Sequence, residues 1–230
     1  MPEDTLRWPG GGARLGPWHG RSDIAHLTIG ARRPPSPDLV ERWLQVLARH
    51  GYESVVTNAL RPLDTLPFMD AGFSVQERLH LLTHDLADIP PVSVGSRRAR
   101  IADEPAVLEL DRRAFRPFWQ LDERLLRHAV DATAATRFRV VGEPGEVTGY
   151  AITGRADRRG YLQRIGVDPA AQGHGVGRSL VADALRWARR YRANDAVVNT
   201  QTDNDPALAL YRSCGFRDLP TGLCVMGRAL

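Results

Sequence analysis

The 230-residue sequence contains no lysine, so all 31 of its basic residues are arginines. This absence excludes the phosphate-binding loop of nucleoside triphosphatases, which needs a lysine after its last glycine. The arginines stand beside acidic residues, as in DRRAFRPFWQLDERLLR (111–127), rather than in one basic stripe. Although the net charge is +4, we therefore expect no nucleic-acid partner.

Long apolar runs and cysteines are also scarce. No apolar stretch approaches the length of a membrane span, and MPEDTLRWPGGG lacks the charged-then-apolar pattern of a signal peptide. We therefore expect a cytoplasmic protein without a membrane partner. The two cysteines, Cys214 and Cys224, are expected to be buried thiols rather than a disulfide. His80 and His84 stand four residues apart without a nearby third ligand, which favours surface histidines over a metal site.

The first part of the chain predicts a short series of strands and one clear helix. Residues 1–20 contain glycine, proline and tryptophan and are interpreted as irregular. Ser36 and Pro37 form a helix start, and apolar residues at helical spacing follow until Gly51. The two prolines of residues 88–98 mark a candidate linker. Strands are predicted in IAHLTIGA (24–31), ESVVTNAL (53–60) and, as one or two strands, GFSVQERLHLLTHDL (72–86).

Beyond residue 98 the sequence predicts a longer series of helices and strands. Helices are predicted over residues 102–115, 121–132, 180–188 and 205–214. Strands are predicted in a hairpin over residues 137–154, with its turn at 143–146, and over residues 160–167, 196–202 and 222–230. Strands therefore alternate with helices, which is typical of an α/β fold.

The chain also contains a weak internal repeat. Residues 197–216 (VVNTQTDNDPALALYRSCGF) align with residues 54–73 (SVVTNALRPLDTLPFMDAGF), so that both end in Gly-Phe and Tyr211 falls opposite Phe68. Upstream, LQRIGV resembles HLTIGA only if seven residues are deleted from the N-terminal copy. The deletion removes a glycine-rich loop, whose place is taken by RRPPSP. If the repeat is real, the first copy kept the scaffold and lost the loop.

That glycine-rich loop, AAQGHGVGRSL (170–180), stands between a predicted strand and a predicted helix. The strict alternation of Gly173, Gly175 and Gly177 differs from the G-x-G-x-x-G of dinucleotide-binding loops. A loop of this kind exposes unpaired backbone N–H groups at the positive end of a helix, and glycines let the backbone approach oxygens that a Cβ would block. The loop therefore predicts a phosphate or pyrophosphate site.

Two motifs carry a family resemblance. Gln172 and the GHGVG that follows match Q/R-x-x-G-x-G/A, and residues 204–216 match N-x-x-A-x-x-L-Y-x-x-x-G-F. The chain thus resembles the GCN5-related N-acetyltransferases (the GNAT superfamily). The resemblance implies a catalytic GNAT domain over residues 94–230, with a mixed, mostly antiparallel sheet flanked by helices. A smaller, degenerate GNAT-like half-domain is expected over residues 1–93.

The resemblance implies acetyl-CoA as the cofactor. Its pyrophosphate would lie on the loop amides, and its pantetheine arm in a gap where two parallel strands, QRIGV and AVVNTQT, splay apart. The Val167 N–H would polarise the acetyl carbonyl. The residues expected to bind the cofactor are Ile165, Gly166, Val167, Gln172, Gly173, His174, Gly175, Val176, Gly177, Arg178, Ser179, Asn204, Ala207 and Tyr211.

The same resemblance suggests catalytic roles. Tyr211 would protonate the departing thiolate as general acid. The ribosomal-protein acetyltransferase subgroup carries a glutamate base where this chain has Asn199, which cannot accept a proton but can orient a water or the amine. Asp122, Glu123 and Glu146 remain equal candidates for the base, and proton loss to ordered water is the alternative.

We therefore expect direct transfer of an acetyl group from acetyl-CoA to a primary amine, either a protein N-terminus or a small molecule. Phe118 and Trp119, between the first two helices of the second half, are expected to wall the acceptor pocket, although aromatics in such a connection also serve as hydrophobic anchors. The alternative function is a non-catalytic acyl-CoA-binding regulatory module. A monomer or homodimer is expected, with the N-terminal half either structural or partner-binding.

Overall fold

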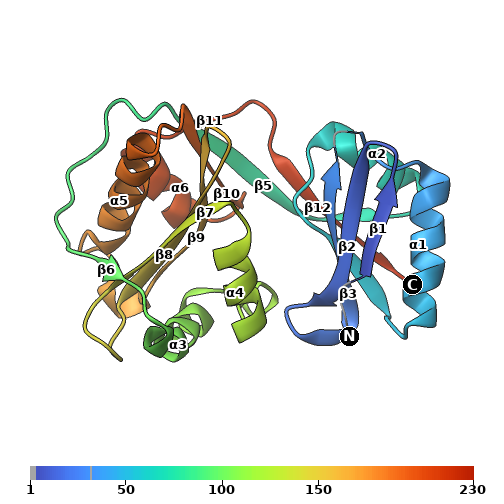
Figure 1. The fold of residues 1–230 in the computed structure, drawn as a ribbon, viewed down its shortest axis with the longest axis horizontal. Helices are drawn as coiled ribbons and strands as arrows, with labels where there is room; N and C mark the ends of the chain where they lie inside the picture. Colours follow the sequence, from blue (N-terminus) through green and yellow to red (C-terminus); the bar gives the residue numbers. More distant parts are fainter. Residues whose placement is uncertain (1–3, 32) are drawn as a thin grey trace. The chain divides into compact units, whose positions relative to one another are not determined.

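The computed structural model describes residues 4–31 and 33–230, and the chain divides into two compact units. Unit 1 contains Met1–His80 and Pro220–Leu230, and unit 2 contains Leu81–Leu219. The C-terminal strand, red in Figure 1, thus belongs to unit 1 although it follows unit 2 in the sequence. That residues 1–93 and 94–230 are two related domains stays a proposal.

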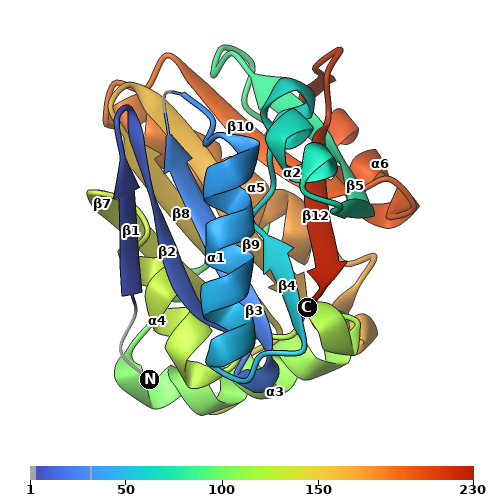
Figure 2. The same ribbon diagram turned by 90° about the vertical axis from the view of Figure 1, so that its right-hand side faces the viewer.

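Unit 1 is a mixed sheet with one long helix against it. Its strands run in the order β1, β2, β3, β4, β12, β5, and only β3 and β4 pair in parallel. Figure 2 shows α1 in front of this sheet. The elements are β1 (Asp4–Trp8), β2 (Gly11–Trp18), β3 (Arg21–Ala31), α1 (Pro37–Arg49), β4 (Ser54–Thr57), η1 (Pro62–Thr65), α2 (Leu66–Asp70), β5 (Ser74–His84) and β12 (Leu223–Ala229).

The predicted helix start at Ser36 is confirmed. The Ser36 hydroxyl accepts a hydrogen bond from the Leu39 amide at 3.3 Å, and Pro37 occupies the first turn, where its missing N–H costs nothing. The apolar face that follows is buried and packs on the strands of unit 1. Its members are Val40, Trp43, Leu44 and Leu47, and they share a core with Ala13, Leu15, Ala25, Leu27 and Val55.

The interpretation of residues 1–20 as irregular is wrong, except that residues 1–3 lie outside the described residues. β1 and β2 pair as one antiparallel hairpin, and β2 pairs with β3 in the next. The glycines that suggested irregular chain serve the turns instead, with Gly10 and Gly20 at φ of 97° and 74°. Pro17 stands where the β2–β3 register shifts, a position at which a strand tolerates proline.

Unit 2 places helices on both faces of its sheet (Figure 1). Five of its strands run in the order β10, β9, β8, β7, β6. The elements are β6 (Arg97–Arg98), η2 (Ile101–Asp103), α3 (Glu104–Ala114), η3 (Pro117–Trp119), α4 (Glu123–Asp131), β7 (Ala135–Val141), β8 (Gly149–Ala156), β9 (Arg159–Val167), η4 (Pro169–Ala171), α5 (Val176–Arg190), β10 (Asp195–Gln201), α6 (Asp205–Ser213) and β11 (Arg217–Asp218).

Alternating side chains of β8 explain the two helical layers. Tyr150 and Ile152 point into the core built with α3 and α4, whereas Ala151 packs with Val176 and Leu180 of α5. A strand covered on both faces is apolar at consecutive positions, and β8 is buried from Gly149 to Gly154. The mixed sheet flanked by helices that the sequence predicts is confirmed.

The parallel pair β9 and β10 separates along its length. Pairing joins Asp195, Ala196 and Val197 of β10 to residues 159–161 of β9. β9 continues to Val167 and β10 to Gln201, and no pair joins those later residues in the described chain. The backbone edges of both strands thus diverge toward their carboxyl ends, as the predicted gap requires.

Three smaller expectations concern the linker, His84 and the two cysteines. Residues 88–98, the candidate linker, lie inside unit 2 rather than between the units. His84 is buried, not on the surface; its Nε2 donates to the Cys214 carbonyl and its Nδ1 accepts from the Leu86 amide. Cys214 and Cys224 are buried free thiols, as predicted. No helix in the described ranges is both long enough and apolar enough to span a bilayer.

Candidate active site

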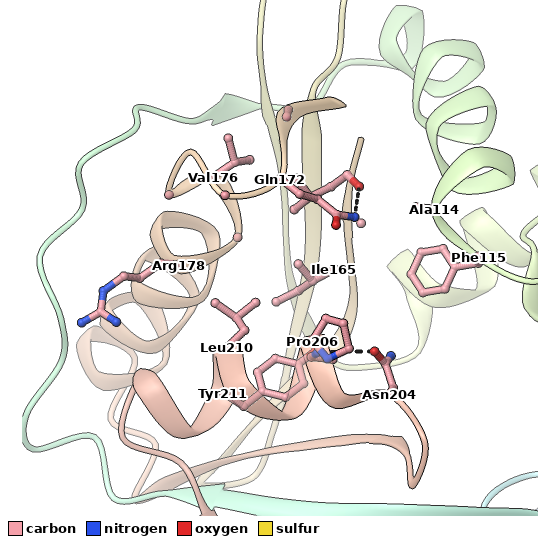
Figure 3. Close-up of a pocket in the computed structure, with 17 residues that line it drawn as sticks. Ala114, Phe115, Ile165, Gln172, Val176, Arg178, Asn204, Pro206, Leu210 and Tyr211 are labelled. Carbon is pink, nitrogen blue, oxygen red and sulfur yellow. Dashed lines mark hydrogen bonds between the residues drawn. The ribbon is translucent and has the colours of Figure 1, made fainter. Parts of the chain in front are cut away.

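A cavity of about 350 Å³ opens in unit 2 beside the diverging ends of β9 and β10. It also borders the start of α5, one face of α6 and the end of α3 (Figure 3). Its lining is Ala114, Phe115, Ile165, Gly166, Val167, Ala171, Gln172, Gly173, Gly175, Val176, Gly177, Arg178, Asn204, Pro206, Ala207, Leu210 and Tyr211. Twelve of the predicted site residues are therefore brought together around one cavity.

The three alternating glycines serve two different purposes. Gly173 and Gly175 have φ of +78° and +80°, a left-handed conformation that other residues adopt only with strain. Gly177 is helical, and a Cβ there would lie 3.1 Å from Leu210 Cδ2. The first two glycines thus shape the loop, and the third lets α6 approach α5.

The loop leaves a row of backbone amides without partners. Within the described chain, none of the amides of residues 173–178 donates to another residue, and the first helical bond runs from the Ser179 amide to the Gly175 carbonyl at 3.0 Å. These amides sit at the positive end of the α5 dipole. Such a row is suited to bind the oxygens of an anion.

Arg178 and Gln172 flank this row (Figure 3). Arg178 Nη1 donates to the carbonyl and hydroxyl of Ser213 at 3.0 and 3.1 Å, which fixes the guanidinium beside the end of α6, and Figure 3 shows it pointing away from Ile165 and Tyr211. Gln172 Nε2 lies 3.5 Å from the Val167 carbonyl oxygen. The free amides therefore lie at one end of the cavity, and a fixed positive charge stands outside that end.

Two predicted cofactor residues do not line the cavity. The His174 ring hydrogen-bonds the Gln172 carbonyl at 2.8 Å. The buried Ser179 hydroxyl accepts the Ser93 and Val94 amides at 3.2 and 2.9 Å. The His174 ring therefore stabilises the loop, and the Ser179 hydroxyl holds the segment of Ser93 and Val94 against α5. Any contact of either residue with a cofactor stays a prediction.

Asn204 and Tyr211 are positioned by the capping of α6. Asn204 Oδ1 accepts the Ala207 amide at 3.3 Å, and its Nδ2 donates to Thr200 Oγ1 at 3.0 Å. Tyr211, two turns later, lines the cavity and is only 7% exposed. Burial raises the pKa of Tyr211 to about 12. The phenol therefore keeps its proton at neutral pH, as a general acid must.

The candidates for a base lie elsewhere. Asn199 is exposed on β10 and does not line the cavity. Asp122 caps α4 by accepting the Leu125 amide at 2.7 Å. Glu123 and Glu146 are exposed, on α4 and in the β7–β8 connection. The titratable side chains that line the cavity are Tyr211 and Arg178, and both are proton donors.

The aromatics expected at the acceptor side lie beside the cavity, not on it. Phe118 and Trp119 stack edge to face, with ring centroids 5.1 Å apart, and neither lines the cavity. Phe115, three residues earlier in the same connection, does. The lining residues that the sequence did not single out are Ala114, Phe115, Ala171, Pro206 and Leu210. Leu210 could have been found, since it belongs to the N-x-x-A-x-x-L-Y motif itself.

Known proteins are similar to this chain in sequence and in fold. Residues 104–216 match the sequence model of the family described as "Acetyltransferase (GNAT) family". A mycothiol acetyltransferase of Catenulispora acidiphila is 28% identical over 163 residues, which cover 63% of this chain and 52% of the relative. The N-alpha-acetyltransferase RimI of Mycobacterium tuberculosis is 44% identical over 77 residues, which cover 32% of this chain and 47% of the relative.

Among solved structures, a tandem GNAT protein from the clavulanic acid biosynthesis pathway aligns with a TM-score of 0.67 and 15% identity. The alignment covers 96% of this chain and 79% of that one. At this identity the likeness concerns the fold. The chain spans about half the length of the curated relatives described above.

Proposed function

We propose that the protein is an N-acetyltransferase that moves an acetyl group from acetyl-CoA directly to a primary amine, because residues 104–216 match the sequence model of the acetyltransferase (GNAT) family. The observation that carries the proposal is the single cavity that joins the free amides of the glycine loop to the buried phenol of Tyr211. Residues from both motifs of the resemblance therefore line the same cavity.

The lining fits coenzyme A. The amides of residues 173–178 and the Arg178 guanidinium suit a pyrophosphate, because unpaired N–H groups at a helix start and a fixed cation both stabilise negative charge. Ile165 and Val167 lie on β9 beyond its last pair with β10, so this edge can pair with an extended arm. Acetyl-CoA would supply the acetyl group, already activated as a thioester.

Tyr211 is proposed to give its proton to the departing thiolate, and the Tyr211 phenolate would then take up the proton that the acetylated nitrogen loses. Its hydroxyl is protonated at neutral pH because burial raises its pKa to about 12. The Val167 N–H is proposed to polarise the acetyl carbonyl. Both groups border the same cavity, which supports a transfer in one ternary complex without a covalent enzyme intermediate.

The acceptor is proposed to enter as the neutral amine. Since Tyr211 and Arg178 are donors, the amine would lose its proton to water before it reaches the cavity. At pH 8, about half of free α-amino groups are neutral, whereas less than about 1% of lysine side chains are neutral. An α-amine, on a protein N-terminus or a small molecule, is therefore favoured, and one of the two curated relatives is named an N-alpha-acetyltransferase.

Asn199 keeps one predicted role, to orient a water or the amine from the edge of β10. Asn199→Ala tests it: an unchanged kcat and an unchanged pH profile would remove this side chain from the mechanism. A cytoplasmic location and a monomeric or homodimeric state also stay predictions.

The rival function is an acyl-CoA-binding module that does not catalyse. Calorimetric titration with acetyl-CoA, followed by a thiol-release assay over a panel of amino-terminal peptides and small α-amines, separates the two. We expect binding and turnover. Binding without turnover on every member would favour the module, and no binding would remove both functions.

A further inference from the structure

A charged pair is buried between α3 and β9, next to the cavity. Asp111 is fully buried, and Arg164 is only 14% exposed. Arg164 Nε and Nη2 lie 2.9 and 2.6 Å from Asp111 Oδ2, and the Tyr150 hydroxyl donates to the same oxygen. Burial raises the pKa of Tyr150 far above its ordinary value, so this hydroxyl remains a donor. Because desolvating two charges offsets most of their attraction, stability alone is a weak reason for such a pair.

The pair also contacts residues 115–121, which belong to the connection between α3 and α4. Arg164 Nη2 donates to the Trp119 carbonyl at 2.7 Å, and the guanidinium carbon lies 3.5 Å from the centre of the Phe115 ring. The other oxygen of Asp111 accepts the Leu121 amide at 2.7 Å. Three points along seven residues are therefore fixed by one ion pair.

This connection forms the wall of the cavity opposite its anion-binding end. Phe115 lines the cavity, and Figure 3 shows it on the side away from Arg178. With coenzyme A phosphates at the Arg178 end, the Phe115 side is where an acceptor would approach. This step rests on the proposed function.

We infer that Arg164 is a positioning residue, which holds Phe115 and the 115–121 connection in place as the acceptor-side wall. The chemistry requires an arginine. A planar guanidinium can fork onto a carboxylate, donate to a carbonyl and stack on an aromatic ring at once, whereas a lysine ammonium replaces only the charge. The substitution Arg164→Lys therefore keeps Asp111 compensated but releases Trp119 and Phe115.

The chain offers a matched control in Arg97 and Asp103. Arg97 Nη1 and Nη2 lie 2.8 and 2.7 Å from the oxygens of Asp103, which is 1% exposed, and Arg97 Nε donates to the Gly142 carbonyl at 2.9 Å. This pair also joins two guanidinium nitrogens to a buried carboxylate and adds a carbonyl, although it uses both carboxylate oxygens where Arg164 uses one, and neither of its residues lines the cavity. Arg97→Lys thus reproduces the loss of packing without touching the proposed wall.

The test compares the wild-type chain, Arg164→Lys and Arg97→Lys in two measurements. Hydrogen exchange at the Leu121 amide should accelerate about tenfold or more in Arg164→Lys and stay unchanged in Arg97→Lys. For an α-amine that the wild type acetylates, Arg164→Lys should raise the acceptor KM about tenfold, with kcat and the acetyl-CoA dissociation constant within about twofold. Arg97→Lys should leave all three constants unchanged.

Equal behaviour of the two variants in both measurements would reduce Arg164 to a structural residue and overturn the inference. An unchanged acceptor KM with faster exchange would overturn it as well, because the wall would then not govern the acceptor. If the wild type acetylates no amine, the proposed function and the acceptor role fail together. Exchange at Leu121 would then show separately whether Arg164 holds the connection.

Discussion

The side-chain amide of Asn58 is paired with the backbone of Ile29. The Ile29 amide donates to Asn58 Oδ1 at 2.7 Å, and Asn58 Nδ2 lies 3.4 Å from the Ile29 carbonyl oxygen. β3 and β4 pair in parallel over residues 24–27 and 54–57, so Asn58 continues that ladder beyond the end of β4. If the sequence repeat is real, Ile29 corresponds to Ile165, which borders the cavity of unit 2. Unit 1 would then close with its own side chain the edge of β3 that corresponds to the β9 edge proposed to bind the cofactor.

We accordingly predict that each chain binds one acetyl-CoA. Asn58→Ala should leave the stoichiometry and the dissociation constant unchanged, because Asn58 belongs to unit 1. The same change should lower the free energy of unfolding by about 1–3 kcal/mol, since it strands the Ile29 backbone groups. Calorimetric titration and urea denaturation measure the two effects. Two molecules bound per chain would contradict this reading of unit 1.

The glycine loop gives a second prediction, with a built-in control. Gly173 and Gly145 both have positive φ, +78° and +86°, and neither has an atom within 4 Å of an added Cβ. Alanine at either position should cost about 1–2 kcal/mol of stability for the strained backbone. Gly173→Ala should also weaken acetyl-CoA binding about tenfold. The strained loop would relax out of its binding conformation, and a cost of about 1.4 kcal/mol to restore that conformation on binding corresponds to a tenfold loss of affinity. Gly145→Ala should not change affinity, and equal affinities for the two variants would count against the loop as the binding site.

Tyr211→Phe should lower kcat by about 10²- to 10⁴-fold, the usual range for loss of a general acid. The acetyl-CoA dissociation constant should hardly change, because the ring and its packing remain. Since burial raises the pKa of Tyr211 to about 12, deprotonation of this phenol should cause no loss of rate between pH 6 and 9. The rate should instead rise with pH as the acceptor amine loses its proton. A falling limb below pH 9 that disappears in Tyr211→Phe would contradict the assigned protonation state.

Acid should destabilise unit 2 through Asp103. Arg97 donates to this buried carboxylate and lowers its pKa. A carboxyl whose pKa is lower in the folded state contributes stability above its unfolded pKa and loses that contribution as the pH falls through the folded value. The melting temperature should therefore drop below about pH 4, and less steeply in Asp103→Asn, which lacks the titrating group. Parallel slopes for the two proteins would show that Asp103 is not involved.

The sequence predicted the elements that local chemistry defines. The Ser36 cap and the two motifs follow from residues near in sequence, whereas the divergence of β9 and β10 was implied by the family resemblance. The strands β1 and β2 were missed because glycines at hairpin turns resemble those of irregular chain. The placement of β12 in unit 1 depends on strand pairing across more than 160 residues, which local pattern does not encode.

The part of the cavity lining that Phe115 forms shows the same limit. AFRPFWQ contains three aromatics, and nothing local distinguishes Phe115 from Phe118 and Trp119. What selects Phe115 is the guanidinium of Arg164, which is 49 positions further along the chain and stacks on that ring. Arg164 in turn is fixed by Asp111, which looks like an ordinary helical acid in the sequence. The wall of the cavity is thus a product of tertiary contacts between α3 and β9.

The most direct test of the central claim is thiol release from acetyl-CoA at pH 8 by the full chain, with two peptides of the same sequence. One has a free N-terminal amine and no lysine, and the other has a blocked N-terminus and one internal lysine. We predict turnover of the first at least about tenfold faster than of the second, because far more of its amine is neutral. Release no faster than acetyl-CoA alone with either peptide, or with a small α-amine in their place, would contradict the account.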